Sequence, residues 1–145
     1  MKKNKAFTII ELLVVIAIIG ILTVIITSNF ATSKSKARDV KRISDINQIQ
    51  LVLELLFDRC NTYPSALSIG TVLCGSYSLG TFTSTIPTDS GTSYGYVNTG
   101  SDYILRADLE NYSSVLIDDK DGDFSSSSDN GCEDSSYYYY CVQSK

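Results

Sequence analysis

An almost unbroken apolar segment near the N-terminus constrains this chain more than any other feature. Residues 7–26 form a run of 20 residues with a single charged side chain, Glu11. A helix of that length, rising ~1.5 Å per residue, can cross a hydrocarbon core of roughly 30 Å. A carboxylate within such a helix costs about 2.5 to 3.5 kcal/mol even on permissive insertion scales, so it normally pairs with another group or marks a function. Glu11 therefore needs a partner.

The residues before this segment predict its orientation. Lys2, Lys3 and Lys5 precede it and no acidic residue does. Positive charge flanking a membrane helix stays on the cytoplasmic side, so the N-terminus is expected in the cytoplasm and the rest of the chain across the membrane. We predict a single-pass helix in the inner or cytoplasmic membrane.

The segment 6–14 reads Ala-Phe-Thr-Ile-Ile-Glu-Leu-Leu-Val. It resembles the class III signal of type IV pilins and pseudopilins, in which a short basic leader is cut before a Phe and the new N-terminus is methylated. The resemblance implies a cleaved leader at residues 1–6 and processing between Ala6 and Phe7, although Ala6 stands where the family usually has Gly. It also implies that Glu11 pairs with the α-amino group of Phe7 on a neighbouring subunit during filament assembly.

Two other interpretations explain less of this segment. A secretory signal also has a basic start and an apolar stretch, and residues 28–31 imitate its small-residue cleavage site. Its apolar stretch is usually 7 to 15 residues, however, and carries no acid. A plain membrane anchor accounts for the length of the run but leaves Glu11 unexplained.

Composition argues against two classes of function. The chain has 12 basic residues, and removing the three leader lysines leaves nine against 16 acidic residues, a formal net charge of −7. Nucleic-acid binders normally carry a basic face, so no direct nucleic-acid contact is predicted. The sequence has no histidine, the commonest general base and metal ligand. We therefore expect neither an enzyme nor a required cofactor.

A helical pattern continues beyond the apolar run. Apolar residues recur at spacings of three and four at Val40, Ile43, Ile46, Ile49, Leu53 and Leu56, and Leu51, Val52 and Leu55 broaden the same face. One long helix is predicted, with a transmembrane or filament-core half at residues 7–29 and an amphipathic half at residues 30–59. A basic cluster lies where the second half begins: Lys34, Lys36, Arg38, Lys41 and Arg42. We interpret it as a solvated collar near anionic head groups, with pairing to the next subunit as the alternative.

Residues 60–145 are rich in Ser, Thr, Gly and Tyr and predict a β-rich head. Short runs of Tyr, Val, Ile and Leu indicate strands at residues 94–97, 103–109, 115–117 and 137–142. The four tyrosines at 137–140 fit a strand whose side chains alternate between two faces. An exposed patch for adhesion or ligand contact is one alternative, and electron conduction through aromatic stacking along the fibre is another. The expected fold class is α+β and pilin-like, with the long N-terminal helix packed on a small antiparallel sheet.

Four cysteines lie in this exported region, where disulfides persist: Cys60, Cys74, Cys132 and Cys141. Four cysteines allow three connectivities, and the sequence does not choose among them. We expect the local pairs, Cys60 with Cys74 and Cys132 with Cys141, because each closes a short loop. The second pair resembles the C-terminal disulfide loop of type IV pilins. Zinc held by four thiolates is the alternative, but no Cys-x-x-Cys pair is present.

The acidic run at 118–123 is the best candidate for a metal site. Asp118, Asp119, Asp121 and Asp123 supply oxygen ligands of the kind that Ca²⁺ prefers. A full EF-hand is excluded, because Phe124 and Asn130 stand where that loop needs Gly and Glu. A looser calcium loop remains a prediction, since the resemblance to major pseudopilins of type II secretion implies calcium in a late loop. A solvated acidic turn is the alternative.

Together these features predict a structural subunit of a type IV pilus-like filament. A major pseudopilin of a type II secretion system is the close alternative, and a membrane-tethered binding domain that never polymerises is a third. The partners that the resemblance implies are further copies of the chain, a prepilin peptidase, an assembly ATPase and an inner-membrane platform protein. The subunit is expected in the membrane before assembly and in an extracellular or envelope-spanning filament afterwards.

Overall fold

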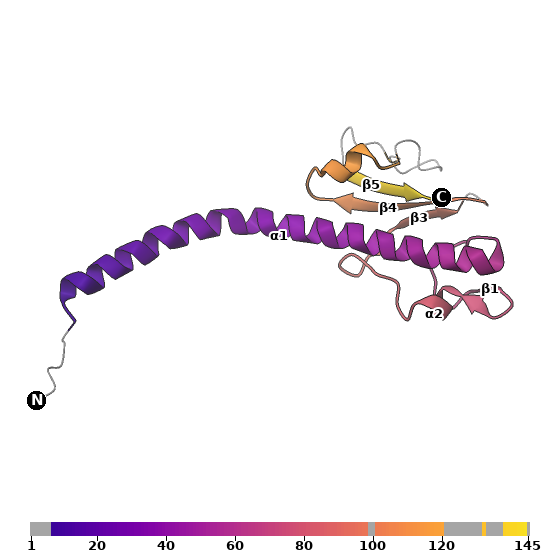
Figure 1. The fold of residues 1–145 in the computed structure, drawn as a ribbon, viewed down its shortest axis with the longest axis horizontal. Coiled ribbons are helices and arrows are strands. Elements are labelled where there is room, and N and C mark those ends of the chain that lie inside the picture. The colour runs from indigo at the N-terminus through magenta and orange to yellow at the C-terminus, as the bar shows by residue number, and fades with distance from the viewer. Residues whose placement is uncertain (1–6, 99–100, 121–131, 133–137, 145) are drawn as a thin grey trace, which may run out of the picture. The chain divides into compact units, whose positions relative to one another are not determined.

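The computed structural model describes residues 7–98, 101–120, 132 and 138–144, and the side chains of residues 25–29 are not described. The chain divides into two compact units, Met1–Ser35 and Lys36–Lys145. Helix α1 (Ile9–Cys60) extends through both, and the other helices and strands belong to the second unit (Figure 1). We call this second unit the head.

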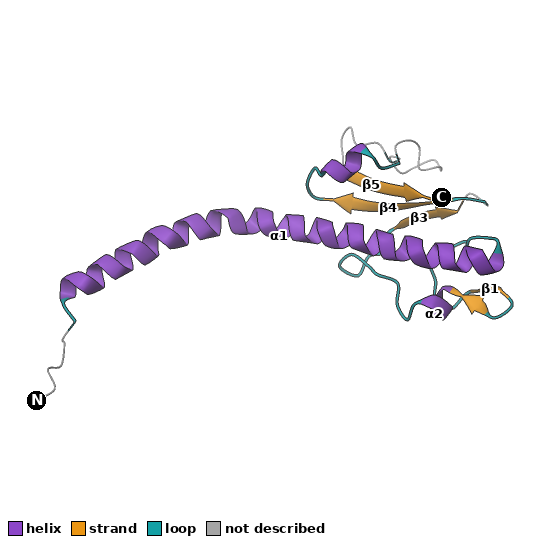
Figure 2. Cartoon of the chain, in the orientation of Figure 1, coloured by secondary structure: helices purple, strands orange, loops and turns teal. Residues whose placement is uncertain are grey.

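Helix α1 is a single helix of 52 residues (Figure 2). It contains no proline, and every residue of its apolar half except Gly20 carries a side chain that restricts the backbone. The helix ends because Asn61 adopts a left-handed conformation (φ 54°) and donates its N–H to the carbonyl oxygen of Phe57 at 2.7 Å. The long helix is confirmed, and it ends at Cys60, one residue after the expected end.

The apolar half of α1 is exposed in the single chain. The large apolar side chains described between Phe7 and Val24 are 46 to 86% exposed. The expected membrane segment, 7–26, includes two residues whose side chains are not described. Among the residues that are described, the structure has no helix that is both long enough and apolar enough to cross a membrane.

The head half of α1 buries a narrower stripe than predicted. Ile46, Ile49, Leu53 and Leu56 are buried in the core, as expected, and each fully buried side chain of this kind contributes about 1.5 to 3 kcal/mol. The prediction was wrong for Val40, Leu51 and Leu55, which are 66, 61 and 44% exposed. The sheet and the segment that includes helix α2 (Leu79–Phe82) leave these three side chains largely in solvent.

A three-stranded antiparallel sheet packs on this stripe. Its strands are β3 (Gly95–Asn98), β4 (Tyr103–Leu109) and β5 (Tyr138–Gln143), in the order β3-β4-β5. Alternate residues of β4 are buried. In the register of the sheet, Asn98 of β3 lies opposite Tyr103 of β4, and Tyr138 of β5 lies opposite Leu109 of β4. Three of the predicted strands are therefore confirmed within one or two residues, although position 137 lies outside the described residues.

The tyrosine run divides between the two faces of β5. Tyr140 and Val142 pack against the main core, whereas Tyr139 packs with Cys132 and Cys141 in a second, smaller cluster. This alternation is the period of two that a strand imposes on its side chains. It supports the strand interpretation of the run.

The remaining elements are short. Strands β1 (Val72–Cys74) and β2 (Tyr77–Ser78) form a small hairpin that is followed by helix α2 (Leu79–Phe82). The strand predicted at 115–117 is wrong: Ser114–Ile117 form a 3-10 turn, η1. Leu116 is buried there while Val115 and Ile117 are exposed, so one apolar contact anchors the segment, and none of the described strands pairs with it.

Candidate assembly site and ion-pair cluster

The first turn of α1 holds the acid that the sequence singled out. Thr8 donates its backbone N–H (2.9 Å) and its hydroxyl (2.6 Å) to Oε2 of Glu11. In return the N–H of Glu11 approaches the hydroxyl oxygen of Thr8 at 3.4 Å. This reciprocal arrangement is a capping box, which satisfies backbone donors that the first turn of a helix leaves unpaired. In a single chain, Glu11 therefore finds its partner within its own helix.

This capping box has a consequence for assembly. A neighbouring amine that pairs with Glu11 competes with the contacts from Thr8, and it brings a full positive charge where Thr8 offers only neutral donors. Charge-assisted hydrogen bonds are roughly twice as strong as neutral ones, so an amine is favoured when the surroundings exclude water. Phe7 is exposed at the start of the described chain, whereas Ala6 and the leader lysines lie outside the described residues.

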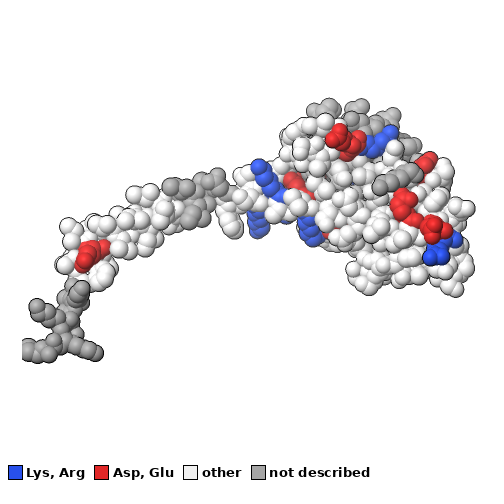
Figure 3. Space-filling view, in the orientation of Figure 1, with Lys and Arg blue, Asp and Glu red and all other residues white. Residues whose placement is uncertain are grey.

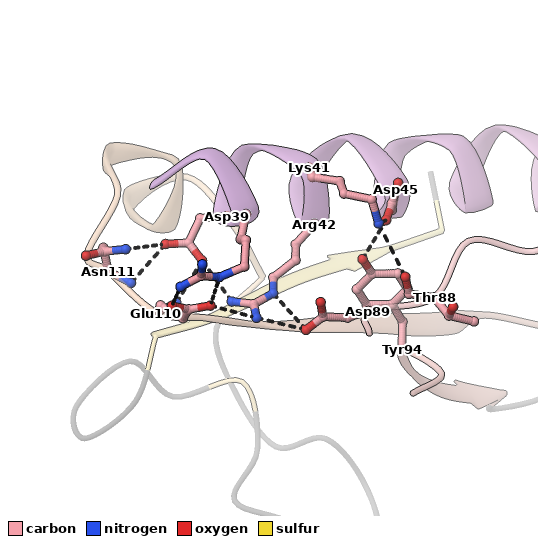
Figure 4. A network of polar contacts seen from close by, with 10 residues as sticks. Asp39, Lys41, Arg42, Asp45, Thr88, Asp89, Tyr94, Glu110 and Asn111 are labelled. Atoms are coloured by element: carbon pink, nitrogen blue, oxygen red, sulfur yellow. Dashed lines mark hydrogen bonds and ion pairs between the residues drawn. The ribbon is translucent and has the colours of Figure 1, made fainter. Parts of the chain in front are cut away.

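An ion-pair cluster holds other segments of the head on its part of α1. It consists of Arg38, Asp39, Arg42, Asp89 and Glu110, and it joins α1 to the loop before β3 and to the end of β4 (Figure 4). Arg42 lies at its centre, with nitrogen atoms 2.9 Å from Asp39, 2.8 Å from Asp89 and 3.0 Å from Glu110. One guanidinium therefore contacts three carboxylates from three segments of the chain.

Asp39 is the second buried member of the cluster. Besides Arg42, its carboxylate accepts the backbone N–H groups of Glu110 (2.8 Å) and Asn111 (3.0 Å), and the side-chain amide of Asn111 (2.7 Å). These bonds fix the turn that leaves β4 against the side of α1 (Figure 4). Burial of this charge is tolerated because both of its oxygens are hydrogen-bonded.

The charges in the cluster shift the pKa of Glu110. A two-point hydrogen bond from Arg38, with a further contribution from Arg42, lowers the pKa of Glu110 from 4.5 to about 2. Next to the cluster, the buried carboxylate of Asp45 accepts hydrogen bonds from Lys41 (3.0 Å) and the Tyr94 hydroxyl (2.7 Å). Burial, followed by the hydrogen bond to Asp45, raises the pKa of Tyr94.

These contacts correct the interpretation of the basic cluster as a solvated collar. Arg38, Lys41 and Arg42 pair with acidic residues of their own head, and Arg42 is buried. Lys34 and Lys36 are exposed, as a collar would require. Figure 3 shows the basic side chains gathered on α1 where the head begins.

A signal for this cluster is present in the sequence, although the predicted apolar stripe did not include it. Positions 39, 42, 46, 49, 53 and 56 follow each other at spacings of three and four. Asp39 and Arg42 therefore extend the buried stripe of Ile46 and Ile49, in place of Val40 and Ile43. Charged residues on an apolar stripe indicate a buried ion pair, because a lone buried charge is costly.

The cysteines form the two local pairs. Cys60 is bonded to Cys74, with their Cα atoms 5.6 Å apart, and this bridge ties the end of α1 to β1. Cys132 is bonded to Cys141 in β5, with Cα atoms 5.9 Å apart. All four cysteines are among the described residues, and none of them is free.

The predicted calcium ligands are described only in part. Asp118 is exposed, and Asp119 accepts the backbone N–H of Cys141 at 2.8 Å, so it also holds β5 in place. Asp121 and Asp123 lie outside the described residues. Within the described part of the chain, no three Asp, Glu, Cys or His side chains gather in a way that could hold a metal ion.

Comparison with known proteins assigns the N-terminal part of the chain. The family model of the prokaryotic N-terminal methylation motif matches residues 1–27. Behind that motif the chain carries the pilin-like α+β head described above. This N-terminal part of the chain is similar to the type IV pilins and pseudopilins.

Curated proteins similar to this chain are named type II secretion system core protein G. Those of Pectobacterium carotovorum subsp. carotovorum and Escherichia coli (strain K12) are both 35% identical over 63 residues, or 43% of this chain. The match covers 40% of the Pectobacterium protein and 43% of the Escherichia coli protein. That of Aeromonas hydrophila is 34% identical over 64 residues, 44% of this chain and 45% of the relative. The chain thus matches less than half the length of these relatives. No solved structure matches it at a significant level.

Proposed function

We propose that the chain is a structural, non-enzymatic filament subunit that acts as a major pseudopilin of a type II secretion system. The observation that carries the proposal is the first unit of the chain, in which a methylation motif lies on the capped N-terminal part of α1. The large apolar side chains described there are exposed, and up to Ser35 Glu11 is the single acidic residue. Such a surface is unstable in water, at about 25 cal/mol for each Å² of apolar area left exposed. Burial in a membrane first and in a bundle of identical helices afterwards removes that cost.

The proposed assembly step is electrostatic. Processing between Ala6 and Phe7 by a prepilin peptidase releases an α-amine at the start of α1. In the filament this amine meets Glu11 of a neighbouring copy, and the two charges neutralise each other in an apolar core. Because an unpaired charge is costly there, only the axial register that pairs them is stable. An assembly ATPase and an inner-membrane platform protein are the proposed partners that extract the subunit from the membrane.

A variant series at Glu11 tests this step. Glu11→Gln keeps an acceptor at the third helical position and so keeps the capping box, but it removes the charge. Glu11→Ala removes both. If the charge drives assembly, both variants lose sheared filaments to the same extent while subunit levels in the membrane stay normal. Assembly of Glu11→Gln at the wild-type level would overturn the proposal, since only the helix cap would then matter.

A type IV pilus subunit is the second candidate, favoured by the Cys132–Cys141 disulfide near the C-terminus. The sequence alone favours a pilus subunit over a pseudopilin, but the named relatives support the pseudopilin better. Deleting the gene separates the two. Loss of exoprotein release supports the pseudopilin, and loss of surface fibres with normal release supports the pilus. The third candidate is a membrane-tethered binding domain that never polymerises. It predicts that the N-terminus stays uncut and that Glu11→Ala functions like the wild type.

Calcium binding at the acidic run remains part of the proposal. Asp118, Asp119, Asp121 and Asp123 are the proposed ligands, and Asp119 would couple the ion to β5 through its bond to Cys141. The ion would stabilise the head by binding the folded state only. A thermal transition that is the same with excess calcium and with chelator would contradict this proposal.

A further inference from the structure

The side of α1 that faces away from the core lacks charge over about five turns. These positions follow one another at spacings of three and four, apart from the adjacent pair Asn47 and Gln48, and all of them are exposed. We call them the outer face of α1: Ala37, Val40, Ser44, Asn47, Gln48, Leu51 and Leu55. Solvent-facing sides of helices normally carry charged residues, so an uncharged face with three exposed aliphatic side chains is typical of a contact surface.

An apolar groove runs beside this outer face. It has a volume of about 170 Å³ and lies between α1 and the segment that includes α2, with Leu51, Val52, Phe82, Ile86 and Pro87 in its lining. Leu51 belongs to both the groove and the outer face. The groove can accept an apolar side chain of another molecule, which would cover Leu51 at the same time.

The charges around the outer face favour a second copy of the chain as the occupant. Lys36 is exposed near one end, and Asp58, at the other end, is exposed and has only a long contact of 3.7 Å to Arg59. Lys36 and Asp58 are 22 positions apart in the sequence, which is roughly 33 Å along a helix. Copies stacked in the same direction with that offset bring the lysine of one against the aspartate of the next.

A lipid surface fits the outer face less well. Between Arg42 and Arg59 the helix has no basic residue, and the chain has a formal net charge of −4. Helices that lie on membranes are typically rich in Lys and Arg on their polar side, which contacts anionic lipid. The seven positions of the outer face itself carry no Lys or Arg.

We propose that the outer face of α1 and its groove form a subunit contact, in which the head of one copy packs against the next copy along the fibre. This inference rests on the proposed filament function and adds a second contact to the pairing at Glu11. The contact is heterologous, because the groove of one copy meets a different part of its neighbour, and such contacts propagate into open helical filaments.

Site-specific photocrosslinking in cells that assemble the full chain tests the proposal. A benzophenone amino acid replaces Leu51, or Val72 as a control with nearly the same exposure (61 and 60%) outside the outer face. One subunit population carries an epitope tag and the other does not. We expect tagged-to-untagged dimers from position 51 in sheared filaments, and far fewer from position 72.

A charge variant gives an independent readout. Leu51→Asp places an unpaired carboxylate in the proposed contact and should lower filament yield about tenfold or more, whereas Val72→Asp should leave it unchanged. Leu51 is exposed, so its replacement should not unfold the head, and an unchanged near-UV tyrosine spectrum checks this.

The outcomes separate the two proposals. If wild-type filaments form but position 51 crosslinks only to lipid, to another protein or to nothing, the outer-face contact is overturned and the filament function stands. Equal filament yields for Leu51→Asp and Val72→Asp overturn it in the same way. If the wild-type chain forms no filaments at all, both proposals fail.

Discussion

Removing Arg42 should loosen the rest of the head from its segment of α1 much more than removing Arg38 does. In Arg42→Met the guanidinium that contacts Asp39, Asp89 and Glu110 is lost, although the aliphatic stem is retained. The Arg42 side chain is 11% exposed, and breaking a buried ion pair by removing one partner costs about 3 to 5 kcal/mol. We expect a cost at the lower end of this range, about 3 kcal/mol, for two reasons. Asp89 and Glu110 are partly exposed, so water can solvate them when Arg42 is lost. Asp39 keeps its three other hydrogen bonds.

The matched control is Arg38→Met. Arg38 is 40% exposed and pairs with Glu110 at the rim of the cluster, so its loss should cost only about 0.2 to 1 kcal/mol. At about 4 °C per kcal/mol for a domain of this size, Arg42→Met should lower Tm by about 12 °C and Arg38→Met by about 4 °C or less. Thermal unfolding of the full chain in detergent, followed by the near-UV tyrosine signal, measures both. Equal, small shifts would refute the idea that Arg42 is the central contact.

Two further predictions concern the stability of the head. In the folded chain the pKa of Glu110 is lowered from 4.5 to about 2, so its contribution to the stability of the head is complete above about pH 4.5 and is lost as the pH falls toward 2. Across this pH window Tm should fall more in the wild type than in Glu110→Gln. Parallel curves of Tm against pH would contradict the ion pair. The Cys60–Cys74 bridge joins residues 14 positions apart, and replacing both cysteines by serine should destabilise the head by about 3 kcal/mol. An unchanged urea midpoint in the double variant would show that the bridge does not constrain the unfolded chain.

The sequence predicted the features that follow from strong local patterns. The apolar run, its single acid and the basic leader identified the N-terminal motif, and apolar spacing of three and four predicted α1 into the head. A short run rich in Tyr, Ile and Leu located β4, and alternate residues of that strand are buried. Short loop closure favoured the two disulfides that the structure contains.

Features that depend on distant segments were predicted less well. Apolar periodicity alone does not tell which side of α1 the sheet will cover, so the predicted core wrongly included Val40 and Leu51. Two of the three acidic partners of Arg42, Asp89 and Glu110, lie 47 and 68 positions away, beyond the reach of helical periodicity. The run at 115–117 has strand-forming residues, but none of the described strands lies beside it to pair with, and it forms η1 instead.

The central claim is that α1 becomes a polymerisation element once the leader is removed, and mass spectrometry of the mature N-terminus tests it most directly. Subunits from sheared filaments or from the membrane of an assembling cell are purified and their N-terminal peptide is sequenced. We predict a chain that begins at Phe7 with one methyl group on its α-amine, and Glu11 as its fifth residue. Intact residues 1–6 in exported material, or a mature chain that begins at any residue other than Phe7, would contradict it.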